Sequence, residues 1–159
     1  MRILGLLIGL LIATPVLADT PEEFAAFQSY QAQRAQVEAK TGKAAAAGWK
    51  LLADTDHANR LPYVKAWCHQ RAALAYHNAK DRDAAEAEAT AALSVEGTSS
   101  EIRRCHARAH SILAHYLALK ADTLEGAKGH YATALELDPS YQTAKEGMRA
   151  VNEAIEAGK

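Results

Sequence analysis

The chain has 159 residues, and its 18 lysine and arginine residues against 19 acidic residues give a net charge of −1. A chain with this balance lacks a long-range field that would gather nucleic acid or anionic lipid, so we expect neither as a partner. Alanine is the commonest residue, at 36 of 159, whereas phenylalanine occurs only twice. Alanine favours helices and lets them approach closely, but each contact buries little area. We therefore expect helices joined by many shallow contacts.

The first 18 residues have the pattern of a secretory signal peptide. Arg2 precedes an apolar run from Ile3 to Ile12, and the small-residue sequence Val16–Ala18 marks a cleavage site. The apolar run is too short to span a bilayer, although a retained anchor is the competing interpretation. We expect residues 1–18 to be removed and residues 19–159 to form one exported, periplasmic domain without membrane insertion.

Two helices are predicted at the start of this domain. Thr20 is placed to cap the first helix, with Glu23 completing a capping box, and Gly42 ends it. The second helix covers residues 43–53. The polar segment Asp54–Arg60 has no periodicity and is predicted to be a loop.

The next two helices form a second pair. Pro62 suits the first turn of a helix that reaches Lys80, and Asp81 is a suitable cap for a helix over residues 82–95. Residues 96–100 contain glycine and three hydroxyl side chains, and they predict a break.

Three further helices complete the prediction. Thr98 is expected to cap a fifth helix that reaches Leu119, and Asp122 begins a sixth that Pro139 ends. A last helix covers about residues 140–157. Because no segment alternates apolar and polar residues between turn signals, we predict an all-α protein.

Small residues repeat in the two later helix pairs. Ala73 corresponds to Ala114, Ala85 corresponds to Ala127, and the segment ending at Pro139 is the clearest copy. This pattern resembles the tetratricopeptide repeat. The resemblance implies antiparallel helical hairpins at about residues 20–55, 61–96 and 98–138. It also implies that they stack as a short right-handed solenoid with a C-terminal capping helix at 140–157. An unrelated alanine-rich bundle is the alternative.

The resemblance also implies a protein-binding role. In tetratricopeptide repeat proteins, the first helices of the hairpins line a concave groove for a partner peptide or helix. Polar residues on the corresponding helices here are Arg71, Asn78, Arg108 and His115, which are our candidates for partner binding. The alternative is that these four form a solvated face. The basic clamp that some members use for a terminal carboxylate is not evident.

Both cysteines precede a histidine, since Cys68-His69 recurs as Cys105-His106, 37 residues later. The first interpretation is a Cys68–Cys105 disulfide, which an oxidising compartment would permit. The second is two buried free cysteines. The third is a metal site in which His106 and His110, one turn apart, act with Cys105 or His69.

No arrangement typical of a catalytic site stands out, because the sequence has neither a glycine-rich phosphate loop nor a nucleophile elbow. We therefore expect a non-enzymatic periplasmic adaptor, without a cofactor, that binds another envelope protein. The alternative is a small exported metal-binding or redox-responsive helical protein that uses the Cys-His pairs.

Overall fold

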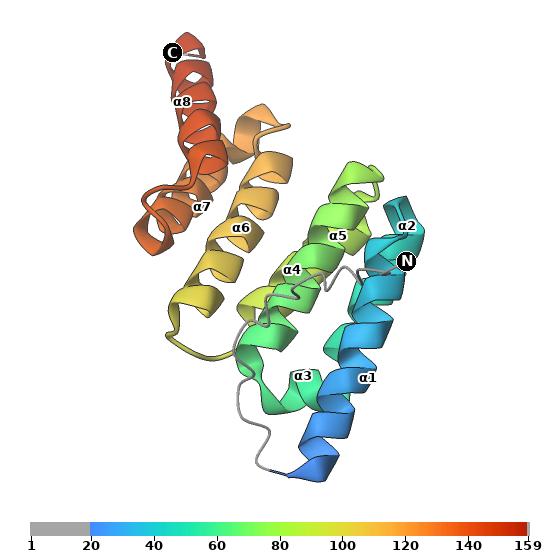
Figure 1. The fold of residues 1–159 in the computed structure, drawn as a ribbon. Helices are drawn as coiled ribbons and strands as arrows, with labels where there is room; N and C mark the ends of the chain where they lie inside the picture. Colours follow the sequence, from blue (N-terminus) through green and yellow to red (C-terminus); the bar gives the residue numbers. More distant parts are fainter. Residues whose placement is uncertain (1–19, 159) are drawn as a thin grey trace, which may run out of the picture.

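The computed structural model describes residues 20–158, and within this range every regular element is helical, which confirms the all-α prediction (Figure 1). The predicted signal peptide lies outside the described residues. No helix in residues 20–158 is both long and apolar enough to cross a bilayer. The elements are α1 (Pro21–Glu38), α2 (Gly42–Ala53), α3 (Asp56–Arg60), α4 (Pro62–Asn78), α5 (Arg82–Leu93), α6 (Ser100–Leu117), the 3₁₀ turn η1 (Ala121–Thr123), α7 (Leu124–Leu137) and α8 (Gln142–Ala157).

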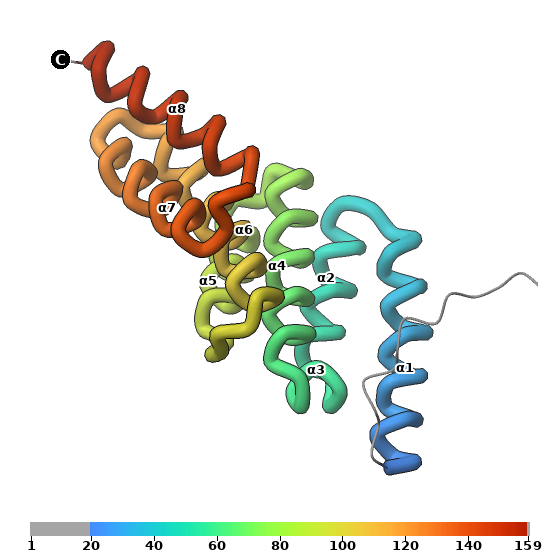
Figure 2. Tube along the Cα trace, turned by 60° about the vertical axis from the view of Figure 1, so that its left-hand side comes forward, coloured from blue at the N-terminus to red at the C-terminus, as the bar shows by residue number. Residues whose placement is uncertain are grey.

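The helices pack in the order of the chain. Helices α1 and α2, α4 and α5, and α6 and α7 form successive pairs, and α8 packs on α7 at the end of the row (Figure 2). Helix α4 contacts α2, α5 and α6, so it connects the first pair to the third. In Figure 1, α1, α4 and α6 form the nearer layer, and α2, α5 and α7 lie behind them.

Side-chain caps fix several helix starts. The Thr20 hydroxyl accepts a hydrogen bond from the Glu23 amide, and the Asp81 carboxylate accepts one from the Ala84 amide, as the sequence predicted. The cap of α6 is Ser99 rather than the predicted Thr98. The two residues are adjacent hydroxyl side chains, so the pattern alone does not distinguish them.

The predicted loop Asp54–Arg60 is wrong, because residues 56–60 form the short helix α3. The Thr55 hydroxyl caps this helix by accepting a hydrogen bond from the Ala58 amide. Ala58 is fully buried in the cluster around Trp49 and Leu52. The ring of His57 also contacts the rings of Phe27 and Tyr30. Burial of one methyl group, the cap and these ring contacts therefore act together to order a largely polar segment.

Fully buried alanines lie along the interfaces between the helices. The apolar area that each alanine methyl group removes from water is small, so each one stabilises the fold only a little. Because no longer side chain intervenes, however, the helix backbones can approach closely. The alanines with no exposed area are Ala46, Ala53, Ala58, Ala66, Ala72, Ala73, Ala85, Ala89, Ala92, Ala107, Ala109, Ala114, Ala127, Ala134 and Ala144.

A buried carboxylate connects three helices. Glu88 of α5 is 5% exposed, and its carboxylate accepts a 2.8 Å hydrogen bond from Nδ1 of His69 on α4. Its other oxygen lies 3.4 Å from Nζ of Lys50 on α2. Burial alone would raise the pKa of Glu88, but the hydrogen bonds and charges of His69 and Lys50 outweigh it and hold that pKa below its usual range.

Replacement of Glu88 by Gln is expected to lower the free energy of unfolding near neutral pH by about 1–3 kcal/mol, because the charge-assisted contacts are lost. Since the folded-state pKa of Glu88 is depressed from 4.5, its contribution is present above about pH 4.5 and is lost as the pH falls through the folded value. Urea unfolding should therefore show wild type and variant converging in acid. The exposed Glu136→Gln is the control and should change stability little at either pH.

Helix α8 lies against α7 at a glycine. A Cβ atom at Gly147 would collide with the phenol ring of Tyr131, whereas one at Gly129 of α7 would meet no neighbour. The absence of a side chain at Gly147 therefore allows the buried Tyr131 to lie between the two helices.

These two glycines give a matched pair of substitutions. We expect Gly147→Ala to destabilise the protein by about 1–3 kcal/mol, since Tyr131 must move out of a packed position. Gly129→Ala should stabilise it by about 0.5–1 kcal/mol through helix propensity alone. Thermal unfolding followed by circular dichroism measures both, and equal shifts in the two variants would contradict this account of the α7–α8 contact.

Candidate functional site

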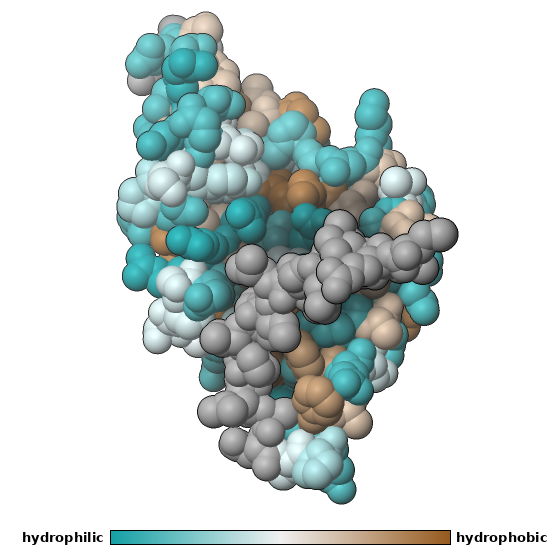
Figure 3. All heavy atoms as spheres, in the orientation of Figure 1, coloured by the Kyte–Doolittle hydropathy of each residue, from teal (hydrophilic) through white to brown (hydrophobic). Residues whose placement is uncertain are grey.

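A hollow of about 410 Å³ lies on the face formed by α1, α4 and α6, with α3 at one side. We call it the central hollow. Its aromatic wall contains Tyr63 and Trp67 of α4, Phe27 of α1 and His57 of α3. The His57 ring lies 5.4 Å from the ring of Phe27. Where this face is visible in Figure 3, hydrophobic and hydrophilic residues are interspersed rather than gathered into one apolar patch.

The central hollow also has a cationic lining. It contains Arg34 of α1 together with Arg104 and Arg108 of α6. The Arg34 guanidinium is engaged, because it lies 4.7 Å from the Trp67 ring centroid and 2.9 Å from the Glu38 carboxylate. Within residues 20–158, no carboxylate forms an ion pair with either Arg104 or Arg108, and both side chains are exposed.

Among the described residues, one acidic side chain, Glu101, lines the central hollow. Hydrogen bonds from its own backbone amide and from the hydroxyl groups of Ser99 and Ser100 hold the pKa of Glu101 below its usual range. The carboxylate is therefore directed at the start of α6. The hollow keeps an excess of positive charge, although the chain as a whole is slightly acidic.

A second hollow of about 390 Å³ lies between the end of α1, helix α2 and the C-terminal half of α4, and we call it the side hollow. Arg71 and Asn78 line it together. The Arg71 guanidinium lies 5.3 Å from the Trp49 ring centroid and 5.9 Å from that of Trp67. Its Nε is buried and has no hydrogen-bond acceptor among the described residues. Arg34 and Arg71 therefore both contact Trp67, which stands between the two hollows.

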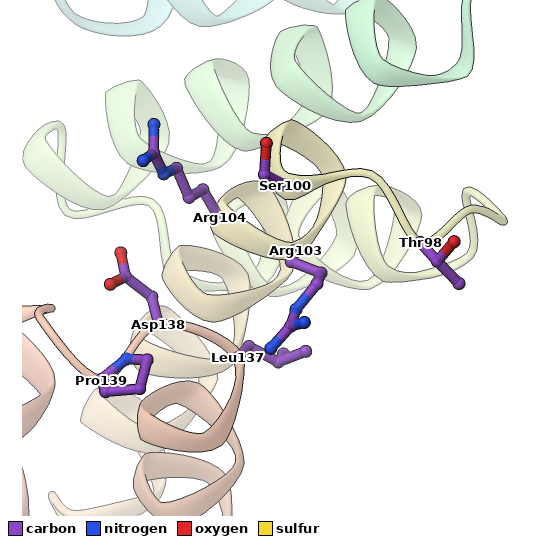
Figure 4. A pocket seen from close by; sticks show the side chains of 7 residues that line it. All are labelled: Thr98, Ser100, Arg103, Arg104, Leu137, Asp138 and Pro139. Carbon is purple, nitrogen blue, oxygen red and sulfur yellow. The ribbon is translucent and has the colours of Figure 1, made fainter.

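A third hollow, also of about 390 Å³, lies between the start of α6 and the turn from α7 to α8, and we call it the end hollow (Figure 4). Arg104 lines both the end hollow and the central hollow, so the two adjoin at this residue. Figure 4 shows the carboxylate of Asp138 across the end hollow from Arg104. Hydrogen bonds from the hydroxyl and amide of Ser140 hold the pKa of Asp138 below its usual range.

The four predicted binding residues do not form one site. Arg71 and Asn78 share the side hollow, and Arg108 lies in the central hollow. His115 lines none of the three hollows; its ring is 4.9 Å from the ring of His77, near the ends of α4 and α6. The His77 Nδ1 is hydrogen-bonded to the Tyr116 hydroxyl at 3.0 Å.

Sequence reasoning missed Tyr63, Trp67 and Arg104 as lining residues. Trp67 and Arg104 each precede a predicted binding residue, Arg71 or Arg108, by one helical turn. Extension of the stripe from the polar candidates to their neighbours four residues away would have found Trp67 and Arg104, and a second step of four residues would have found Tyr63. The search for polar residues alone left out the aromatic ones.

The predicted Cys68–Cys105 disulfide is absent, and both cysteines are buried free thiols. A 3.6 Å hydrogen bond joins Cys68 Sγ and Tyr30 Oη, and Cys68 packs in the cluster with Trp49. Cys105 packs with Ile102 in a different cluster. Burial is the largest influence on each thiol and raises both pKa values to about 11.

The two Cys-His pairs are not structurally equivalent, and this explains why the cysteines do not meet. A shift of 41 residues, not 37, places buried residues of α4 on buried residues of α6. Under this shift Cys105 corresponds to Val64, one turn from Cys68. The corresponding buried pairs are Val64 and Cys105, Ala66 and Ala107, Cys68 and Ala109, Gln70 and Ser111, and Ala73 and Ala114.

The histidines proposed as metal ligands are directed to separate partners. His106 Nε2 donates a 3.1 Å hydrogen bond to the Val95 carbonyl oxygen, and His69 is hydrogen-bonded to Glu88. His110 Nδ1 lies 2.8 Å from His130 Nδ1; burial first, and then the charges of His130 and His106, lower the pKa of His110 to about 4. In the described part of the chain, no three His, Cys, Asp or Glu side chains are grouped for a metal ion.

The side chains that line these hollows are suited to non-covalent binding. Aromatic faces accept apolar side chains, and guanidinium groups bind carboxylates through paired hydrogen bonds. No family model matches the chain, and no match was found among curated proteins or among solved structures. The functional argument therefore depends on the geometry of these surfaces.

The free thiols can be checked directly. Mature protein purified without reductant and then unfolded in guanidinium should release two thiols per chain to Ellman's reagent, with no increase after reduction. The folded protein should react slowly, because both thiols are buried and their pKa of about 11 keeps them protonated. Cys105→Ala should remove one thiol. If the thiols of the wild-type protein react only after reduction, the free-thiol interpretation is wrong and the Cys68–Cys105 disulfide is supported.

Proposed function

We propose that this chain is an exported, periplasmic adaptor of the tetratricopeptide repeat type, in which α1, α4 and α6 bind a segment of another envelope protein. The observation that carries the proposal is the central hollow. Side chains from all three of these helices line it, and it combines aromatic residues with Arg104 and Arg108, which form no ion pair within residues 20–158. Aromatic residues and arginine are the side chains most enriched at the energetic centres of protein interfaces.

The solenoid part of the proposal is supported by the order of packing. Each helix pair contacts the next, and α4 contacts both α2 before it and α6 after it. The 41-residue correspondence between α4 and α6 places five buried residues of one helix on buried residues of the other. In a right-handed stack of such hairpins, equivalent faces of the first helices would line one continuous groove.

A binding role without catalysis suits this surface better than the alternative. In the metal-binding or redox-responsive hypothesis, the Cys-His pairs would act together. Their side chains instead contact different partners: Cys68 contacts Tyr30, His69 contacts Glu88, and His106 contacts Val95. Each of these contacts has a structural explanation, whereas Arg104 and Arg108 form no ion pair within the described residues.

Photocrosslinking from defined positions tests the adaptor function. A benzophenone side chain placed at Gln31, in the central hollow, should crosslink to one specific envelope protein in whole cells of the source organism. The same group at Lys128, exposed on α7 outside the three hollows, should not.

The purified partner should then bind the wild-type chain at least about tenfold more tightly than Tyr63→Ala/Arg108→Ala, since central aromatic and arginine contacts dominate interface energies. Titration calorimetry measures this ratio, and circular dichroism confirms that the variant is folded. Identical crosslinks from Gln31 and Lys128, or equal affinity of the variant, would contradict groove binding.

A further inference from the structure

We propose that the partner segment is an internal acidic stretch that carries one large apolar side chain. The apolar side chain would lie against Tyr63 and Trp67, and the carboxylates would bind Arg104 and Arg108. This inference deepens the proposed function and rests on it, because it assigns the chemistry of the segment that the central hollow binds.

The first argument is charge. Three arginines and one glutamate line the central hollow, and the glutamate is hydrogen-bonded at the start of its own helix. Arg34 is shared between Glu38 and the Trp67 ring. Arg104 and Arg108 lie one helical turn apart on α6; their charges help to lower the pKa of Asp138, but neither forms an ion pair within the described residues. Two carboxylates of an extended segment can therefore bind to these neighbouring guanidinium groups.

The second argument is the correspondence between the two helices. Under the 41-residue shift, Tyr63 corresponds to Arg104 and Trp67 corresponds to Arg108. Equivalent positions of α4 and α6 therefore present an aromatic pair and a cationic pair to the same hollow. A segment that crosses from α4 to α6 would contact the aromatic pair first and the cationic pair next, so its apolar and acidic residues should be close in sequence.

The end hollow limits the length of the acidic stretch in the partner segment. Beyond Arg104 it presents the carboxylate of Asp138, which is held ionised by hydrogen bonds from Ser140 (Figure 4). A further acidic residue there would be repelled. A hydroxyl, amide or basic side chain would instead donate a hydrogen bond. The expected segment therefore reads as a large apolar residue, then two or more acidic residues, then a hydrogen-bond donor.

These features favour a peptide over a nucleic acid or an acidic polysaccharide. A volume of about 410 Å³ accommodates a few side chains, not a long regular polyanion. Glu101 and Asp138 interrupt the positive surface, and the net charge of the chain is −1. A polyanion gains its affinity from many phosphate or sulfate contacts, which two open arginines do not provide.

Selection from a library of random short peptides displayed on phage tests the composition of the segment. The target is the full mature chain, and bound phage are counted after a parallel selection on Tyr63→Ala/Arg108→Ala. Peptides enriched on wild type alone are expected to contain an aromatic residue or leucine beside two or more Asp or Glu residues. The best peptide is then synthesised with a fluorophore for anisotropy measurements.

Two double variants separate site-specific binding from general charge. Arg104→Gln/Arg108→Gln should lower the affinity for the peptide by about tenfold or more, because the variant loses both charge-assisted contacts. Lys128→Gln/Arg149→Gln removes the same amount of positive charge from α7 and α8, and its affinity for the peptide should stay within about twofold of the wild-type value. Replacement of the peptide's Asp and Glu by Asn and Gln should cause a loss similar to that of the first variant, and added salt should weaken wild-type binding.

The failures are distinguishable. Enriched peptides without acidic residues, or with affinity unaffected by Arg104→Gln/Arg108→Gln, would overturn the acidic segment and leave the adaptor function standing. An absence of peptides that depend on the central hollow would count against the adaptor function itself. Single-stranded oligothymidine that binds more tightly than the best peptide, and depends on the same two arginines, would replace the peptide with a nucleic acid.

Discussion

Close contact between helices through alanine is the constraint on which the rest of this structure depends. The fully buried alanines lie at the interfaces of consecutive pairs, including Ala73, Ala85, Ala114 and Ala134. A methyl group lets two backbones approach but buries little area and specifies little about the sliding of one helix past another. Larger or polar side chains must therefore set the alignment. Glu88, bonded to His69 and Lys50, does so for α2, α4 and α5, because a shift of any of these helices would leave a buried charge without a partner.

The same constraint accounts for the position of the candidate site. When alanines fill the interfaces, some bulky side chains lie at the edges of the contacts, where they border solvent. Trp67 is such a residue: it packs against the buried Trp49 at a ring separation of 4.9 Å and also lines the central hollow. The guanidinium groups of Arg34 and Arg71 lie 4.7 and 5.9 Å from its ring centroid. An aromatic residue at the edge of an alanine interface thus serves both packing and the binding surface.

Local features of the sequence predicted most of the fold, and features that depend on distant neighbours account for what was missed. The caps at Thr20 and Asp81 act within three residues, so their patterns were sufficient. Helix α3 depends on the burial of Ala58 against helices that come earlier and later in the chain, and no local period reveals this. The hollows likewise combine residues of α1, α4 and α6, so four polar candidates on two helices could identify only part of their lining.

The Cys-His pairs show how a conspicuous motif can indicate the wrong register. Their spacing of 37 residues resembles a repeat period, but the buried small residues of α4 and α6 correspond at 41. The difference is about one helical turn, so Cys105 takes the place of Val64, and both side chains line the central hollow. The same register places Arg104 and Arg108 at the positions of Tyr63 and Trp67.

Side chains that must fit between helices are constrained by packing, whereas those that face the hollow can differ from one helix to the next. The register of such helices is therefore best determined from buried alanines. Equivalent positions that face the hollow differ in chemistry between α4 and α6, and this difference gives the surface both aromatic and cationic residues.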